Sequence, residues 1–239
     1  MHGELDKLRK IINNIEQTAS EIVFIGDYVN KGKNSKRVVD YLLELKKNIK
    51  CVFLMGNHEY VWNSFLLGGT KYNEFLIKFG GIECLESYLG RNVSLNEALS
   101  ILGKQEFVNN LFPDMHKEFF RTALPYYELD KFVCVHAGLN PEYKNESLSK
   151  HNAEEIVFIR EKFIHSEFLF MGKRIIFGHT AFNRPYIDSY KIGIDTGAVY
   201  GKKNKLIALN VDGMTFIDHE GTTSTAEEYN DAEILFCNK

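Results

Sequence analysis

The 239-residue sequence has few cysteines, no strong excess of either charge and no long apolar run. Its four cysteines include no Cys-x-x-Cys pair and three lie in apolar stretches, which favours reduced thiols over disulfides or a zinc site. There are 29 basic and 32 acidic residues, and this net charge of −3 argues against a dedicated nucleic-acid binder. No apolar run approaches the roughly 18 residues that a bilayer-spanning helix needs. We therefore expect a cytoplasmic protein with neither a membrane nor a nucleic-acid partner.

What the sequence does contain indicates a folded globular protein. Hydrophobic residues make up 44% of the chain and charged residues 26%, which excludes wholesale disorder. Because a domain usually spans about 100–200 residues, the chain forms one large domain or two small ones, with a substantial core.

Helical and strand-like patterns alternate in the first part of the chain. Apolar residues recur at helical spacing over residues 4–17, and the apolar run 22–25 is typical of a strand buried on both faces. Ser35 caps a second expected helix, and a second buried strand covers residues 51–55. Helices and strands that alternate with short connections predict an α/β fold.

Residues from about 60 to 124 have a mainly helical pattern, which we interpret as an insertion in the α/β domain. Strands follow it, with a hairpin turn at Asp212-Gly213. These later strands are expected near residues 132–135, 175–177, 191–194, 206–211 and 214–217. The domain is thus placed at residues 1–220, and residues 221–239 are expected to form a polar, loosely held tail.

Four of the expected strands end in a polar residue of a type that binds metal ions. These residues are Asp27, Asn57, His136 and His179. Because the carboxyl ends of strands in an open α/β sheet are where side chains converge, we expect the four to lie close together. A lone histidine is more often a hydrogen-bonded structural residue, but four convergent oxygen and nitrogen donors predict a site.

The donor types indicate the class of metal. One carboxylate, one amide carbonyl and imidazoles suit Mn²⁺, Fe²⁺ or Zn²⁺, and the lack of thiolate argues against structural zinc. A carboxylate that bridges two ions is the usual centre of a two-metal hydrolytic site, with the ions about 3.5–4 Å apart. We expect two divalent ions, Mn²⁺ first, with Fe²⁺, Zn²⁺ or Ni²⁺ as alternatives.

A set of motifs surrounds these residues. In order they are Gly26-Asp27-Tyr28-Val29-Asn30-Lys31-Gly32, Gly56-Asn57-His58-Glu59, His136-Ala137-Gly138-Leu139, Gly178-His179-Thr180 and Asp195-Thr196-Gly197, preceded by His2-Gly3-Glu4-Leu5. From His2 to Val211 the chain resembles the phosphoprotein phosphatases, within the calcineurin-like metallophosphoesterases. The resemblance is to the bacterial branch, and it implies an α/β sandwich of two mixed β-sheets packed face to face, with helices outside.

The resemblance also implies the metal ligands. Asp27 would bridge the two ions, and His2, at the end of the family's Asp-x-His-Gly motif, would bind the first. Asn57, His136 and His179 would complete the coordination shell of the second ion. The aspartate of that opening motif falls one position before Met1, and the strand that carries it is missing too. We therefore expect the chain to be a fragment or to have a misassigned start.

Two further catalytic positions match the family and two depart from it. His58 would be the general acid that protonates the leaving oxygen, a role worth about 10²–10⁴-fold in rate. Arg160 would hold the phosphate oxygens; the alternative is a solvated arginine on a helix. Asn30 stands where protein phosphatases have an aspartate that charges the catalytic histidine, and Lys31 replaces an arginine. Since diadenosine tetraphosphate hydrolases also lack this aspartate, we expect lower efficiency or a different substrate.

The expected reaction is hydrolysis of a phosphate monoester by metal-activated water, without a phosphoenzyme intermediate. The principal expectation is a bacterial-type Ser/Thr protein phosphatase, a monomer acting on a phosphoprotein or a phosphorylated small molecule. Two alternatives stay open: a dinucleoside polyphosphate hydrolase, and a pseudophosphatase that binds phosphoprotein without turnover.

Several other residues have two interpretations. Glu59 orients the neighbouring amide or caps the helix that follows, and Asp195 supports a metal ligand or only forms a turn. The lysines of residues 31–36 attract an anionic substrate or are simply solvated. Trp62 is interpreted as a packing residue. Histidines outside the motifs are expected in polar surroundings and not as ligands.

Overall fold

The described residues of this computed structural model, 1–229 and 232–235, contain ten strands. They are β1 (Glu21–Phe24), β2 (Lys50–Phe53), β3 (Tyr126–Glu128), β4 (Phe132–Val135), β5 (Arg174–Phe177), β6 (Tyr186–Ile187), β7 (Lys191–Gly193), β8 (Ile207–Asn210), β9 (Thr215–Asp218) and β10 (Thr223–Thr225). Five of them form a mixed sheet in the order β3-β4-β5-β7-β6, in which β4, β5 and β7 are parallel. The strands β1 and β2 form a parallel pair, and β8, β9 and β10 form an antiparallel sheet.

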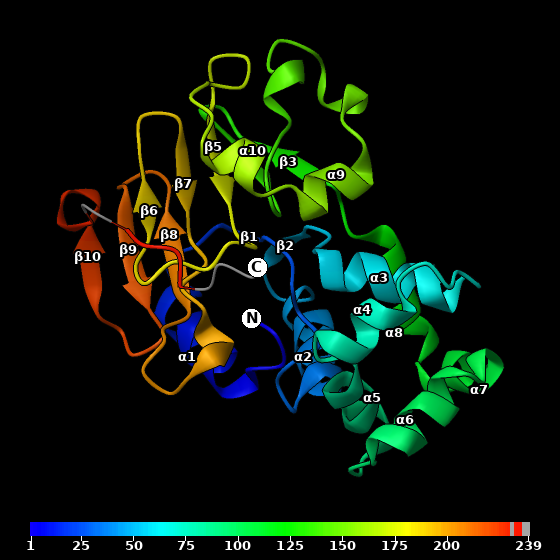
Figure 1. Ribbon diagram of the computed structural model, residues 1–239. Helices are drawn as coiled ribbons and strands as arrows, with labels where there is room; N and C mark the ends of the chain where they lie inside the picture. Colours follow the sequence, from blue (N-terminus) through cyan, green and yellow to red (C-terminus); the bar gives the residue numbers. More distant parts are fainter. Residues whose placement is uncertain (230–231, 236–239) are drawn as a thin grey trace.

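Helices surround these sheets, so the expected mixed α/β fold is confirmed. They are α1 (Leu5–Ile15), α2 (Ser35–Leu45), α3 (Asn57–Leu66), α4 (Asn73–Lys78), α5 (Gly81–Leu89), α6 (Leu95–Leu102), α7 (Gln105–Leu111), α8 (Asp114–Thr122), α9 (Ala153–Phe158) and α10 (Glu161–Ile164). Six of the helices, α3 to α8, lie between β2 and β3 in the sequence, where the helical insertion was expected. Figure 1 shows them together on one side of the molecule, with β6 to β10 on the other.

The strands form three hydrogen-bonded sheets instead of the two that were expected. Leu54, just after β2, bridges to Leu124, just before β3, and this contact joins the parallel pair to the five-stranded sheet. On its other side, β1 borders a cavity of about 480 Å³ that α1 and β8 also line. Because of this cavity, Val23 and Ile25 are only half-buried, although the sequence predicted a strand buried on both faces.

Helix α1 packs through the apolar stripe that its sequence predicts. Its buried residues are Leu5, Leu8, Ile11 and Ile12, and they belong to a core cluster that also includes Phe24 of β1 and the buried faces of α2, α3 and α5. The helix therefore stabilises β1 and, with it, the loop that follows β1.

Part of the segment after residue 220, which was expected to form a polar tail, pairs with the domain, and residues 230–231 and 236–239 of that segment lie outside the described residues. Residues 223–225 form β10, which pairs with β9, and Ile234 bridges to Phe182. The expected hairpin around Asp212-Gly213 joins β8 to β9. The three cysteines in the described residues are free thiols, and Cys237 lies outside those residues. None of the described helices has both the length and the apolarity to cross a bilayer.

Candidate metal centre

Four loops at the carboxyl ends of strands bring the predicted ligands together. Asp27 follows β1, Asn57 follows β2, His136 follows β4 and His179 follows β5. The Nε2 atom of His136 lies 3.0 Å from Asn57 Oδ1 and 3.3 Å from Asp27 Oδ1, and His179 Nδ1 lies 3.1 Å from Asn57 Oδ1. Ligand atoms of Asp27, His136 and His179 all lie within 4.8 Å of one another, close enough to share one ion.

His2 lies on the other side of Asp27. Its backbone N–H donates to the carbonyl of Asp27, and its ring Nδ1 lies 2.9 Å from the carbonyl of Val29. These contacts hold His2 Nε2 at 3.2 Å from Asp27 Oδ2. Ligand atoms of His2, Asp27 and His58 form a second group within 4.8 Å, so Asp27 belongs to both groups.

The hydrogen bonds show that lone pairs face one another at this site. His136 Nδ1 donates to the carbonyl of Ile25 at 2.6 Å, so in the neutral ring Nε2 carries a lone pair. That lone pair faces the oxygens of Asn57 and Asp27. The Oδ1 atom of Asp27 is buried without a hydrogen-bond partner among the described residues. Buried acceptors that converge without a donor fit a cation, so the residues present suit divalent metal ions.

The ionisation of these side chains suits the same role. Burial favours a raised pKa for Asp27, but His136, His2 and His58 together outweigh it and hold the pKa of the carboxyl well below its usual range. Burial lowers the pKa of His2 and places the pKa values of His58 and His179 well below the ordinary histidine value. At neutral pH the site thus offers a charged carboxylate at Asp27 and neutral imidazole rings at His2, His58 and His179.

The backbone around Asp27 is tightly constrained. Asp27 has a φ of 58°, in the left-handed region that few non-glycine residues adopt. Four backbone N–H groups converge on the buried Glu59 carboxylate: those of Gly56, Asp27, Tyr28 and Val29. A Cβ at Gly56 would lie 2.4 Å from the backbone nitrogen of Asp27, so only glycine allows this approach. Glu59 thus holds the loop of Asp27, a role that the sequence alone did not indicate.

The catalytic histidine predicted by the family resemblance is fixed by a buried hydrogen-bond chain. Trp62 Nε1 donates to Asn30 Oδ1 at 2.7 Å, and Asn30 Nδ2 lies 2.6 Å from His58 Nδ1. An indole N–H is only a donor, so the amide oxygen must face Trp62 and the amide NH₂ must face His58. Nδ1 of His58 is therefore an acceptor. The prediction that Trp62 is a packing residue missed this second role.

Two cations stand beside the two ligand groups. Lys31 Nζ donates to His2 Nε2 at 3.1 Å and to the Tyr200 hydroxyl at 2.9 Å. Arg160 contacts His179 Nε2 at 3.0 Å and donates to the Thr180 hydroxyl at 3.2 Å. The site therefore has positive charge beside both ligand groups, which attracts anionic groups.

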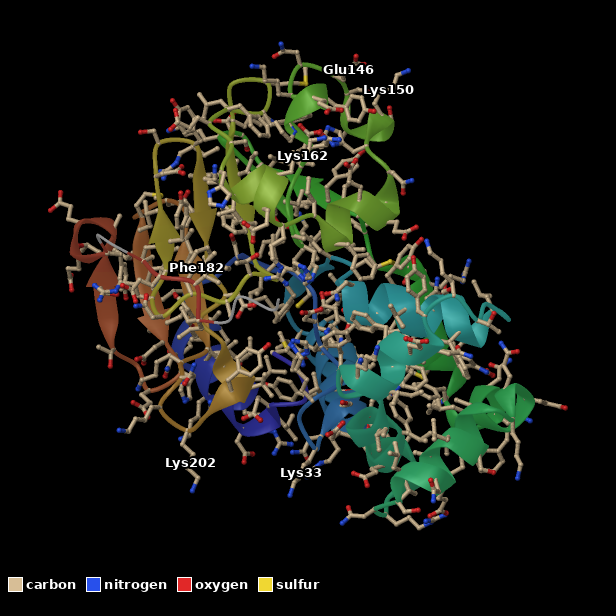
Figure 2. The ribbon with its side chains drawn as sticks, in the orientation of Figure 1. Lys33, Glu146, Lys150, Lys162, Phe182 and Lys202 are labelled. Carbon is tan, nitrogen blue, oxygen red and sulfur yellow. The ribbon has the colours of Figure 1, made fainter. Side chains whose placement is uncertain are left out.

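Other residues singled out in the sequence do not belong to the two ligand groups found among the described residues. The side chain of Asp195 accepts from the backbone N–H of Gly197, as a turn residue does. Lys33 extends outward from the lower edge of the molecule in Figure 2, which favours the solvated alternative for that lysine. His116, His151 and His219 are buried, although His116 keeps polar partners in Asp40 and the Tyr88 hydroxyl. None of the three belongs to the two ligand groups found among the described residues.

Known proteins match this chain over most of its length. The family model for calcineurin-like phosphoesterases matches residues 1–217. The bis(5'-nucleosyl)-tetraphosphatase PrpE [asymmetrical] of Oceanobacillus iheyensis is 26% identical over 91% of this chain and 88% of its own length.

Solved structures share the fold. A cold-active protein-tyrosine phosphatase of a Shewanella species superposes with a TM-score of 0.62 at 17% identity, over 94% of this chain and 77% of the other. A putative diadenosine tetraphosphatase superposes with a TM-score of 0.56 at 20% identity, over 91% of this chain and 88% of the other. Together with the family match over nearly the whole sequence, the geometry of the site leads to one conclusion: this chain belongs to the calcineurin-like phosphoesterase family.

Proposed function

We propose that this protein is a metal-dependent hydrolase that cleaves the polyphosphate chain of a dinucleoside polyphosphate. The observation that carries the proposal is the position of Asp27, whose two carboxylate oxygens face separate groups of imidazole nitrogens. The choice of substrate is supported by relatives named bis(5'-nucleosyl)-tetraphosphatase, which match 91% and 87% of the chain. This substrate replaces the principal expectation of a Ser/Thr protein phosphatase, which none of these relatives specifically supports.

We assign a separate role to each group of residues in the site. Asp27, His2, Asn57, His136 and His179 would hold two divalent ions. Bound there, the ions would lower the pKa of water and neutralise phosphate charge. Lys31 and Arg160 orient the phosphate chain through its oxygens, and His58 donates an N–H to the oxygen that leaves.

The test is hydrolysis by the purified full chain with Mn²⁺, measured by separating the nucleotide products of diadenosine tetraphosphate. A phosphoserine peptide is assayed in parallel, and metal content is measured on the same protein. We expect metal-dependent cleavage of the dinucleotide, two ions per chain and slower turnover of the peptide.

Asp27→Asn is the matched variant, because it keeps the size of the side chain and removes the shared charge. We expect it to lose metal and at least about 10²-fold in rate. An active Asp27→Asn protein would contradict the bridging role. Phosphopeptide binding without any turnover would support the pseudophosphatase instead.

A further inference from the structure

We propose that Phe75 and Phe79 of the insertion form an aromatic platform on which a purine base of the substrate stacks. Phe75 lies in α4 and Phe79 directly follows it. This inference rests on the proposed function, because it adds a place for the nucleoside part of a dinucleoside polyphosphate whose phosphates lie at the metal centre.

A packed aromatic cluster supports the platform from behind. The ring of Phe75 lies 4.6 Å from that of Phe79 and 5.9 Å from that of Phe158, the last residue of α9. Phe158 in turn stacks on Tyr72, with ring centres 5.8 Å apart and 14° between the ring planes. Helices α4 and α9 both pack on α3 (Figure 1). Because these contacts already fix the ring of Phe75, a ligand does not have to order it on binding.

The platform begins beside the first ligand group. The ring of Phe75 lies edge-on to the ring of His58 at 5.1 Å, and the ring of His58 lies 4.6 Å from that of His2. Ligand atoms of His58, His2 and Asp27 all lie within 4.8 Å of one another. A flat group attached to a phosphate at this ligand group would therefore have aromatic surface next to it.

The backbone connects the platform to the cation on the same side of the site. Phe79 is followed by Gly80, whose carbonyl accepts from the backbone N–H of Lys31 at 3.1 Å. A Cβ at Gly80 would collide with that nitrogen, so only glycine allows this approach. The Nζ atom of Lys31 contacts His2 Nε2 at 3.1 Å. A phosphate held by Lys31 and a base held by the platform are thus neighbouring parts of one ligand.

The exposure of the two rings suits a flat ligand. Phe79 is 38% exposed and Phe75 is half-buried. Three other phenylalanines of the insertion are buried in the core instead: Phe112, Phe119 and Phe120. A purine has a flat π surface that stacks on aromatic side chains. The cations beside the ligand groups favour a ligand that also carries phosphate, and a nucleotide combines the two.

The first test separates the base from the phosphates. Diadenosine tetraphosphate is compared with inorganic tripolyphosphate, which has no base, using the full chain with Mn²⁺. Phe79→Leu keeps an apolar side chain and removes the π surface. We expect it to lower the ratio of kcat/KM on the dinucleotide to kcat/KM on tripolyphosphate by about 10-fold, mainly through a higher KM for the dinucleotide. Phe107→Leu is the matched control, because Phe107 of α7 is 49% exposed, and it should leave the ratio unchanged.

The second test does not depend on turnover. Trp62 is the only tryptophan of the sequence, and it is buried. Phe79→Trp places an indole on the platform, and EDTA keeps the nucleotide from being hydrolysed. We expect ATP to quench the fluorescence of this variant and inorganic tripolyphosphate to leave it unchanged. Phe107→Trp is the matched control and should not respond to ATP.

The outcomes distinguish this inference from the proposed function. An unchanged ratio in Phe79→Leu would overturn the platform and leave the hydrolase intact, and so would fluorescence of Phe79→Trp that ATP does not quench. Absence of metal-dependent hydrolysis of any polyphosphate would overturn the proposed function, and the fluorescence result would then decide on its own whether the platform binds a base.

Discussion

Glu59 is the residue that determines the shape of the loop carrying Asp27. Its Oε1 accepts from the backbone N–H groups of Tyr28 and Val29 at 2.8 and 3.1 Å. Its Oε2 accepts from those of Asp27 and Gly56 at 2.8 and 3.1 Å. Burial and the nearby charge of Asp27 raise the pKa of Glu59 to about 7, against the effect of these N–H groups. Four donors directed at one carboxylate hold Asp27 in its left-handed conformation.

We expect Glu59→Gln to destabilise the protein, because the amide keeps one acceptor and turns an NH₂ group toward two backbone donors. The free energy of unfolding in urea should fall by about 2–4 kcal/mol, and Mn²⁺ should bind more weakly in calorimetry as the loop relaxes. Glu44→Gln is the matched control: Glu44 is exposed and pairs with Lys47, so its loss should change stability by less than about 1 kcal/mol. Equal stability of the two variants would contradict this role of Glu59.

The hydrogen-bond chain of Trp62, Asn30 and His58 shows which site residues the sequence predicts and which contacts it does not predict. The motifs singled out Asn30 and His58, but Trp62 lies 32 positions from its acceptor and belongs to an apolar helix face. No periodicity indicates which atom a buried indole N–H will find. Contacts of this kind are decided by tertiary packing.

At the scale of elements, the sequence predicted which strands end at the metal-ligand residues. The runs that end before Asp27, Asn57, His136 and His179 are strands or the ends of strands, because apolar β-branched runs pair into buried sheets. Pairing partners were less predictable. The short strand β10 is polar and joins the sheet through backbone hydrogen bonds to β9. A hydrophobicity pattern does not predict such backbone pairing.

The helices of the insertion are tied to α2 by one buried histidine. His116 of α8 lies 2.9 Å from Asp40 of α2 through Nε2 and 2.8 Å from the hydroxyl of Tyr88 of α5 through Nδ1. Burial lowers the pKa of His116, and Asp40 only partly opposes this. Near and below pH 6.5 the unfolded chain therefore binds more protons at this residue than the folded chain does.

The sign of the pH dependence follows. The contribution of His116 to stability is present above pH 6.5 and is lost as the pH falls toward its folded-state pKa. Urea unfolding at pH 7.5 and pH 5.5 should show a smaller acid-induced loss for His116→Gln than for the original protein. His165→Gln is the control, because that ring is largely exposed, and it should leave the loss unchanged. An identical acid-induced loss in all three proteins would contradict this assignment.

At the scale of the whole molecule, the metal centre joins parts of the chain that are far apart in sequence. Its predicted ligands are His2, Asp27, Asn57, His136 and His179, which come from both halves of the protein. His2, Asp27 and His179 all have φ between 50° and 62°, so the ligand loops carry backbone strain. An ion bound to these residues would hold both halves together and offset the repulsion between their lone pairs.

Metal ions should therefore stabilise the folded protein. Free Mn²⁺ at about 100 times its Kd adds about 2.7 kcal/mol to the free energy of unfolding, and 1 kcal/mol shifts the Tm of a chain of this size by about 2–4 °C. We expect Mn²⁺ to raise the Tm by about 5–10 °C over the protein in EDTA, measured by scanning calorimetry. Asp27→Asn removes the shared carboxylate charge and should shift by less than about 1 °C. A shift of the same size in that variant would place the bound ions elsewhere on the molecule, and the donor geometry around Asp27 would then have no part in holding them.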